Sequence, residues 1–393
     1  MLTLLDVTFF SNGEFKNGSE LIKSQASALG YLDFIRQQMH VEVIKHMNSE
    51  EHLEVNNIPF HFFTATNRFF SIPVKALQYI KTIKPDVVVV QGLIFPFQVM
   101  LLKAVVGKRT IILAQHHGER ANRSIIRNIF NKLADKCITA YLFNTPAYAE
   151  ERLLQKTIGD SRKIKQLPEG SNLFTRKNKH QARIDLNINA NGPVFLWVGR
   201  PNENKDPLTI LKAFEIYSCL VPGALLYMIY QTDQLLRRIK ALLEQDLQLQ
   251  ERVHLVGKVE HEQLETWYNA ADFFLSGSHF EYGGFAVLEA MACGCVPIAT
   301  DIPTMQQYLQ HGQLGFLFAP GDIAALADVL LDLENYDIKK MSQDIAARFR
   351  HMYAFEKIAD GLKEICSGLY FEQIQHLPHG VVNTVSANGR VIE

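Results

Sequence analysis

The sequence lacks the features of a disulfide-stabilised protein, a zinc or thiol redox protein and a membrane-spanning protein. Its five cysteines are odd in number and scattered along the chain without CxxC spacing, so we expect free thiols in a reducing compartment. The longest apolar region, residues 87–107, has about the ~20 residues that a membrane span needs, but Gln91, Pro96 and Lys103 interrupt it. A strand, a turn and a helix are therefore expected there.

An excess of one charge sign, a targeting segment and a dinucleotide fingerprint are also absent. The formal net charge of −1 provides no general attraction to nucleic acid, so no nucleic acid partner is expected. The N-terminal stretch carries Asp6 and has neither a basic start nor a small-residue cleavage site, so we expect a cytoplasmic protein. No GxGxxG follows the first expected strand, which disfavours an oxidoreductase.

The composition is that of an ordinary folded protein, and the same pattern recurs in both halves. A chain of 393 residues is too long for one compact core, and 47% hydrophobic and 21% charged residues are typical of globular domains. Each half alternates β-branched runs with amphipathic stretches, which predicts two α/β units with parallel sheets. The expected strands are 2–9, 41–45, 60–63, 87–91, 110–115, 137–143 and 163–166, then 194–198, 225–230, 253–256, 273–275, 296–299 and 315–318. The expected helices are 19–37, 73–83, 96–105, 121–134 and 146–155, then 207–218, 233–247, 261–269, 284–293, 305–311, 323–333 and helical stretches within 337–369.

The stretch from residue 279 to 297, HFEYGGFAVLEAMACGCVP, has the features of an anion site at the start of a helix. Gly283 and Gly284 leave the N–H groups of the first helical turn free to bind phosphate. Glu281 lies just before the helix and Glu289 inside it, and carboxylates accept hydrogen bonds from vicinal hydroxyls. Phosphate and hydroxyl pairs occur together in a sugar nucleotide, which this stretch predicts as the ligand. A surface helix with two solvated glutamates is the alternative.

Two cations follow the first expected strand of the second half, in the sequence FLWVGRPNENKDP. Arg200 and Lys205 would lie at the carboxyl edge of the sheet, where they are placed to neutralise a diphosphate. Arginine offers a planar fork of donors and lysine a mobile point charge. We expect both to stabilise a leaving nucleoside diphosphate.

Together these motifs resemble those of the retaining glycosyltransferases of family 4, within glycosyl transferases group 1, which have the GT-B fold. Glu281 and Glu289 match the family's E-x7-E signature, and Arg200 and Lys205 match its Gly-Arg-x4-Lys element. The resemblance implies two Rossmann-like domains facing across a cleft. It also implies transfer of a sugar from a nucleoside-diphosphate donor, UDP or GDP being favoured, to a glycan or lipid-linked acceptor hydroxyl. No metal or cofactor is expected, and the product would be a glycan, polysaccharide or glycolipid.

The resemblance also implies roles for individual residues. Glu289 would bind the ribose hydroxyls and Glu281 the hydroxyls of the donor sugar. The backbone amides of Gly283, Gly284 and Phe285 would hold phosphate or sugar oxygens. Val259 lies in the segment whose backbone lines the nucleotide base in the family, and this leaves the identity of the base open.

A histidine pair, His116 and His117, ends the expected strand 110–115 at the edge that would face the cleft. A histidine there can donate a hydrogen bond to a donor-sugar hydroxyl or to the departing phosphate as charge develops. His117 precedes Gly118, as in the family's His-Gly form, so we choose it as the catalytic histidine. Glu119 is a weaker candidate for acceptor contacts or acid–base help. For either histidine, a structural role at the strand end is the alternative.

The domain boundaries follow from composition and from the resemblance. The polar stretch 171–192 indicates a linker, so we expect domains at 1–170 and 171–350. By resemblance, residues 351–375 form a helix that crosses back to the first domain. Residues 376–393 show no periodicity and are expected to be a loose tail.

Two further questions stay open at this level. The expected helix 121–134 is basic and amphipathic, so it could lie peripherally on the inner face of an anionic membrane, but we expect its apolar side to pack in the core. Sugar-nucleotide epimerisation or hydrolysis, or a non-catalytic sugar-nucleotide-binding scaffold, are the alternatives to glycosyl transfer.

Overall fold

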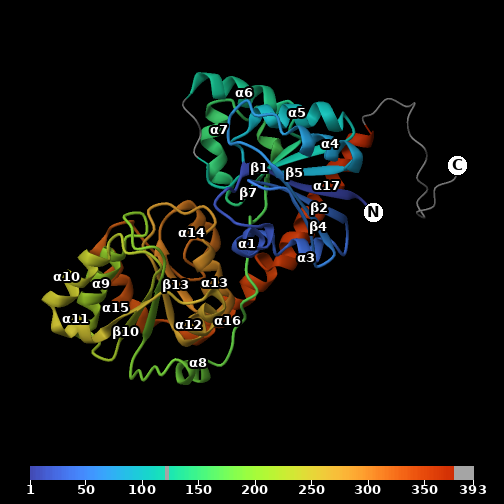
Figure 1. The fold of residues 1–393 in the computed structure, drawn as a ribbon. Helices are drawn as coiled ribbons and strands as arrows, with labels where there is room; N and C mark the ends of the chain where they lie inside the picture. The colour runs from blue at the N-terminus through green and yellow to red at the C-terminus, as the bar shows by residue number, and fades with distance from the viewer. Residues whose placement is uncertain (120–123, 376–393) are drawn as a thin grey trace.

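Two α/β domains, each built on a largely parallel sheet, make up the protein. The computed structural model describes residues 1–119 and 124–375, with the first domain above the second in Figure 1. The two-unit α/β architecture predicted from the sequence is confirmed. The expected tail 376–393 and the first residues of the expected helix 121–134 lie outside the described residues.

The first domain contains an eight-stranded sheet. Its strands are β1 (Thr3–Ser11), β2 (His40–Met47), β3 (Glu51–Val55), β4 (Ile58–Thr64), β5 (Val87–Gln91), β6 (Ile111–Gln115), β7 (Ala140–Phe143) and β8 (Ile164–Gln166). They lie in the order β3-β4-β2-β1-β5-β6-β7-β8, and only the β3–β4 pair is antiparallel among the described pairings. The central strands are continuous apolar runs because helices cover both faces of the sheet.

The helices of the first domain divide between the two faces of this sheet. They are α1 (Gly18–Ser24), α2 (Ala26–Leu29), α3 (Leu32–Ile35), α4 (Val74–Ile83), α5 (Pro96–Val106), α6 (Ile125–Asp135), α7 (Glu150–Leu154) and two 3₁₀ turns, η1 (Pro146–Ala149) and η2 (Ser161–Lys163). Leu21 and Ile35 from the first group of helices lie in the core on one face. Leu77 of α4 and Leu102 of α5 lie in the core on the other face.

The second domain repeats this plan with a six-stranded parallel sheet. Its strands are β9 (Val194–Val198), β10 (Leu225–Ile229), β11 (Val253–Gly257), β12 (Phe273–Ser276), β13 (Val296–Thr300) and β14 (Phe316–Phe318), in the order β11-β10-β9-β12-β13-β14. Its helical elements are α8 (Lys179–Asp185), α9 (Pro207–Leu220), α10 (Leu236–Gln245), α11 (Leu247–Arg252), α12 (His261–Ala270), α13 (Phe285–Cys293), α14 (Pro303–Tyr308), α15 (Ile323–Asp332), η3 (Leu333–Asn335) and α16 (Ile338–Met352). One apolar core unites both faces of this sheet with its helices.

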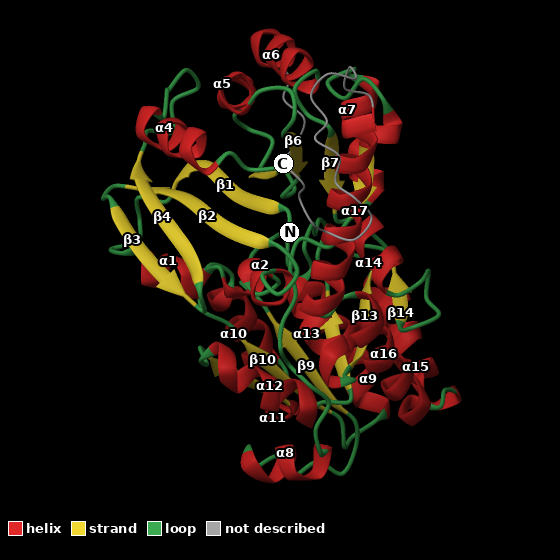
Figure 2. Cartoon of the chain, turned by 90° about the vertical axis from the view of Figure 1, so that its right-hand side faces the viewer, coloured by secondary structure: helices red, strands yellow, loops and turns green. Residues whose placement is uncertain are grey.

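The last helix, α17 (Phe355–Gln375), leaves the second domain and packs on the first (Figure 2). Phe355 and Leu362 are buried in the core that α1–α3 share with the first sheet. Near the end of the helix, the Tyr370 hydroxyl donates to Asp86 Oδ1 at 3.0 Å. Within the part of the chain that the structure describes, no helix combines the length and apolar character needed to cross a membrane.

The structure differs from the predicted elements where side-chain contacts decide the local conformation. The single helix expected over 19–37 is three short helices, and Gly30 between α2 and α3 lets the Phe355 ring approach where a Cβ atom would stand. Strand β3 is absent from the predicted set because its sequence is charged and half-exposed, as suits an edge strand. The expected helix 233–247 ends at Gln245, and the Asp246 side chain caps the separate helix α11.

Candidate functional site

The N-terminus of α13 is open because two glycines precede it. Gly284 is the N-cap residue in the left-handed conformation, with φ at 58°. A Cβ atom there would be strained and would stand 3.0 Å from the Tyr308 ring. At Gly283 a Cβ atom would overlap the carboxylate of Glu169, which belongs to the first domain. No side chain caps this helix end, so the backbone N–H groups of Phe285 and Ala286 have no partner among the described residues.

The loop after β9 brings Lys205 to Glu281. Lys205 Nζ lies 2.9 Å from Glu281 Oε2 and also contacts Oε1. Asn204 joins the same two loops, since its side chain donates to Phe280 O at 3.0 Å and accepts from Phe280 N at 3.1 Å. Lys205, Glu281 and Gly284 line one small pocket, so a cation, a carboxylate and the open helix end meet at one place.

Arg200 lies in the same loop as Lys205 but has a different environment. The residue is exposed, and its carbonyl accepts from Asn202 N at 2.8 Å. Its guanidinium forms no hydrogen bond or ion pair with residues that the structure describes. Of the sequence-predicted site residues, Lys205 and Glu281 are therefore in contact, whereas Arg200 stands at the surface of the loop.

Glu289 is held inside the second domain by two donors from α12. Its side chain is 7% exposed. Its Oε1 lies 2.7 Å from His261 Nε2, and its Oε2 accepts from the Tyr268 hydroxyl at 2.9 Å. The hydrogen bond to Glu289 raises the pKa of His261, although burial lowers it. A carboxylate has about four acceptor sites, so Glu289 can still receive two hydroxyl hydrogens.

A cavity of about 370 Å³ lies beside this group, between the domains. His261 and Phe174 form part of its wall on the second-domain side, and their rings lie 5.1 Å apart. Residues of α1 and α2, including Ala26, line the opposite side. Val259, two residues before His261, is half-buried and packs against the core of the second domain.

His117 lies after β6, with about a third of its side chain exposed. Its Nδ1 is 2.8 Å from Glu169 Oε2 and its Nε2 is 2.8 Å from Gln91 Oε1. Both ring nitrogens thus face acceptors, as an imidazolium requires. Burial lowers the pKa of His117, but the hydrogen bond and charge of Glu169 and the charge of Glu119 outweigh it, so the pKa is raised.

His116 has a structural environment. It is buried, stacks on Phe143 with ring centres 4.7 Å apart, and meets Tyr282 of the second domain edge to face at 4.6 Å. Burial lowers the pKa of His116 to about 4. Glu119 supports this strand end, because its carboxylate accepts from His117 N and Leu93 N, each at 2.9 Å.

Sequence reasoning missed two groups that complete the site. Glu169 lies against both His117 and Gly283, and its position in the Pro-Glu-Gly segment near the linker was the available signal. Asn144 joins the domains from the end of β7: its backbone N donates to the Tyr282 hydroxyl at 3.0 Å and its Nδ2 to the Tyr308 hydroxyl at 3.0 Å. No sequence pattern marked this contact.

Among the described residues, no group of three or more His, Cys, Asp or Glu side chains is arranged to hold a metal ion.

Comparison with known proteins identifies the second domain. Residues 178–351 match the family described as glycosyl transferases group 1. A D-inositol 3-phosphate glycosyltransferase from Paenarthrobacter aurescens strain TC1 is 27% identical over 242 residues, which are 58% of this chain and 57% of that protein. The chain spans about half the length of the curated relatives that it matches.

Solved structures resemble the whole chain. Sucrose-phosphate synthase from Thermosynechococcus elongatus has a TM-score of 0.71 at 20% identity, covering 95% of this chain and 100% of that chain. Anabaena HepE in complex with UDP has a TM-score of 0.70 at 16% identity, covering 94% and 100%. At these identities the likeness establishes the fold. The chain therefore has the two-domain GT-B fold, and its residues 178–351 match the glycosyl transferases group 1 family.

Proposed function

We propose that this protein is a retaining, metal-independent glycosyltransferase that moves a sugar from a nucleoside-diphosphate donor to an acceptor hydroxyl. The observation that carries the proposal is the meeting of Lys205, Glu281 and the open end of α13 in one pocket of the second domain. A diphosphate needs cations and amide donors, while a sugar needs a carboxylate acceptor. This pocket offers all three within one ligand's reach.

The diphosphate would lie at the first turn of α13. Its negative charge is met there by the helix dipole, the amides from Gly283 to Phe285 and the ammonium of Lys205. Arg200, whose guanidinium has no partner among the described residues, would turn toward the same diphosphate. Together these groups would stabilise the charge that develops on the leaving phosphate oxygen, which is the task that a metal ion performs in other transferases.

The donor nucleoside would occupy the cavity of about 370 Å³, with its ribose near Glu289. Glu289 retains acceptor capacity for two hydroxyls, and the His261 ring offers a flat face for the base. UDP or GDP is the proposed nucleotide, and the similarity to a HepE structure that contains UDP supports the first of these.

Transfer with retention would proceed on one face of the sugar. The acceptor oxygen forms a bond to the anomeric carbon as the bond from that carbon to the phosphate oxygen breaks, and the acceptor proton passes to the departing phosphate oxygen. His117, whose pKa is raised by its contact with Glu169, would donate to a sugar or phosphate oxygen in place of Gln91. Glu281 would orient the sugar hydroxyls. Closure of the domains would limit hydrolysis by excluding water.

The acceptor is proposed to be a glycan or lipid-linked glycan, and the protein is proposed to act in the cytoplasm. The similarity to an inositol phosphate glycosyltransferase is consistent with a polyol acceptor.

The test is donor turnover by the purified full chain with UDP- and GDP-sugars, first alone and then with added sugar and lipid-linked acceptors. We expect acceptor-dependent release of the nucleoside diphosphate and an α-linked product from an α-linked donor. Release without product would indicate a hydrolase, and a changed donor sugar would indicate an epimerase. Binding without any turnover would indicate a scaffold, and no binding of either nucleotide would refute the proposal.

A further inference from the structure

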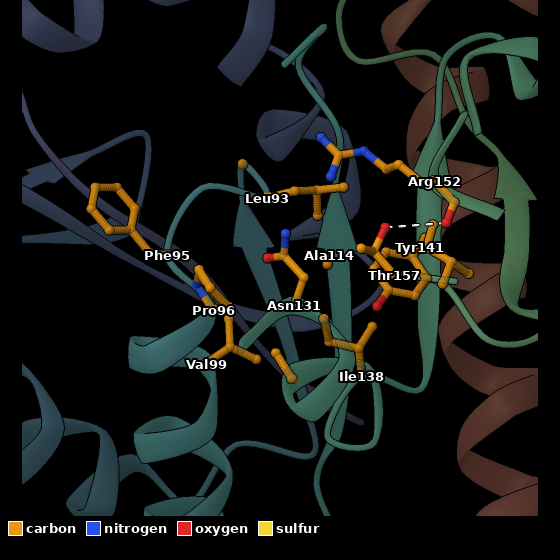
Figure 3. Close-up of a pocket in the computed structure, with 13 residues that line it drawn as sticks. Leu93, Phe95, Pro96, Val99, Ala114, Asn131, Ile138, Tyr141, Arg152 and Thr157 are labelled. Carbon is orange, nitrogen blue, oxygen red and sulfur yellow. Dashed lines mark hydrogen bonds between the residues drawn. The ribbon is translucent and has the colours of Figure 1, made fainter. Parts of the chain in front are cut away.

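The apolar side of α6 points away from the protein interior. Ile125, Ile126 and Ile129 are 79%, 63% and 52% exposed, and Leu133, one turn further on, is 39% exposed. The inward side of the helix contributes the small and polar residues instead. Asn131, together with the buried Ala134, lines a cavity of about 30 Å³ between α6 and the sheet (Figure 3). The expectation that the apolar side of this helix packs in the core is therefore wrong.

A second exposed apolar segment is fixed beside α6. The Phe130 ring of α6 meets the Phe69 and Phe70 rings edge to face, with ring centres 5.2 and 5.5 Å away. Buried Gln98 of α5 donates to Phe69 O at 3.0 Å and Ser71 O at 2.9 Å, which holds this segment in place. We define the docking face as the exposed side chains of both segments: Phe70, Ile72, Val74, Ile125, Ile126, Ile129 and Leu133.

Isolated apolar side chains on a surface are normal, but several exposed apolar side chains on two adjoining segments mark an interaction site. Burying an isoleucine side chain is favourable by about 1.5–3 kcal/mol. If α6 were rotated about its axis, its isoleucines would be buried in the domain and its polar side would face the solvent. Their outward orientation is explained if a partner outside the chain buries the isoleucines.

The segments that carry and adjoin the docking face are strongly basic. Residues 65–83 and 124–136, which carry it, and the adjoining residues 93–109 together contain nine lysines and arginines and one acidic residue, Asp135. Asp135 is itself paired with Lys163 at 3.0 Å, and of the nine cations Lys75 is paired with Glu50 at 2.7 Å. The guanidinium of Arg127 lies over the Phe69 ring, 5.3 Å from its centre, so a cation sits within the apolar patch. In a chain of net charge −1, this is a local concentration of positive charge.

We propose that the docking face binds an anionic lipid bilayer. The isoleucines and Phe70 would enter the boundary between headgroups and acyl chains, while Arg127, Lys132 and neighbouring cations meet lipid phosphates. A second copy of this chain is a poorer occupant, because two such faces would bring like charges together. A bilayer supplies apolar surface and negative charge in the same plane.

The position of the docking face suits this role. Figures 1 and 2 both show α6 at the end of the first domain that is remote from the second domain. Docking there leaves the second domain clear of the bilayer and free to open and close. The inference does not depend on the transfer chemistry, because lipid binding can be measured without donor or acceptor.

The test is co-sedimentation of the full chain with vesicles of phosphatidylcholine alone and of phosphatidylcholine mixed with phosphatidylglycerol. We expect binding to the anionic vesicles only, weakened by added salt. Ile125→Ser/Ile129→Ser should lower the partition coefficient by at least about tenfold, because two exposed anchors lose their apolar groups. The matched control is Leu220→Ser/Leu247→Ser, which changes two similarly exposed leucines on the second domain and should bind as the unmodified chain does.

Charge is tested in the same way. Arg127→Glu/Lys132→Glu should abolish binding to anionic vesicles, whereas Arg237→Glu/Lys240→Glu on the exposed side of α10 should not. The proposal is overturned if the unmodified chain does not bind anionic vesicles. It is also overturned if Ile125→Ser/Ile129→Ser and Leu220→Ser/Leu247→Ser reduce binding equally. It is also overturned if sedimentation equilibrium shows a dimer that Ile125→Ser/Ile129→Ser dissociates, since a second copy would then be the occupant.

Discussion

Replacing Glu289 with glutamine is expected to weaken donor binding while leaving the shape of the pocket intact. The carboxylate is buried and accepts from His261 and from Tyr268 on separate oxygens. Glutamine keeps the size of the side chain, but its amide offers one acceptor oxygen and one NH₂ donor. One of the two donors therefore loses its partner, and the ribose hydroxyls lose a charged acceptor.

The magnitude follows from the change in acceptor charge. A hydrogen bond to a charged group contributes about 1.5–3 kcal/mol and a neutral one about 1 kcal/mol. For two ribose hydroxyls the loss is about 1–4 kcal/mol, which is roughly a fivefold to a thousandfold rise in the Kd of the nucleotide.

Calorimetric titration with UDP and GDP measures this directly. The matched variant is Tyr268→Phe, which removes one donor to Glu289 but keeps the carboxylate, so its nucleotide affinity should be unchanged or tighter. Urea unfolding of both variants establishes that each is folded. The reasoning is refuted if Glu289→Gln binds nucleotide as the unmodified protein does, or if Tyr268→Phe loses as much affinity.

The same variant should change the pH dependence of stability. The hydrogen bond to Glu289 raises the pKa of His261 in the folded protein above its unfolded value. The resulting stabilisation is complete below the unfolded pKa and is lost as the pH rises through the folded pKa. In Glu289→Gln we expect the urea midpoint to lose this decline, which in the unmodified protein sets in as the pH rises above the unfolded histidine pKa of about 6.5.

Three further outcomes are expected. Arg200→Ala should lower kcat more than it raises KM, because its guanidinium is proposed to act on the leaving diphosphate, whereas Arg237→Ala on α10 should leave both unchanged. Glu169→Gln should move the alkaline limb of the pH–rate profile to lower pH, because the carboxylate raises the pKa of His117 and its loss deprotonates the imidazole earlier. Asn144→Ala should lower the free energy of unfolding by about 2 kcal/mol in urea titrations, because buried partners across the domain junction lose a hydrogen bond.

Each of these has an outcome that contradicts it. If Arg200→Ala and Arg237→Ala have equal kinetic effects, Arg200 does not act on the diphosphate. An unshifted alkaline limb in Glu169→Gln would show that protonated His117 has no part in the rate. A stability loss in Asn144→Ala no larger than for an exposed asparagine such as Asn335 would mean that the junction contributes little to folding.

Much of the fold was predictable from the sequence because local apolar runs and turn residues specify the strands and helices of both halves. Central strands such as β5 and β9 are short apolar runs between turn signals, and their bounds agree with the predicted 87–91 and 194–198. The short helices α1–α3 and the edge strand β3 were not predictable, because contacts with α17 and with a neighbouring strand decide them. Helix α8 within the expected linker was missed because its sequence is polar.

The sequence by itself predicted most of the groups in the candidate site, although not Glu169 or Asn144. Two glycines, two glutamates and two cations at fixed spacings predict the ligand chemistry, since local backbone geometry and side-chain type are enough to specify an open helix end and its neighbours. Only the tertiary structure decided how these groups are paired. It shows that Lys205 meets Glu281, that Glu289 is held by α12, and that His117 is held by Glu169. These pairings join segments that are far apart in the chain, and no local periodicity reports such contacts. Only the tertiary structure shows that the apolar side of α6 faces outward, because an amphipathic pattern specifies an apolar side but not what that side faces.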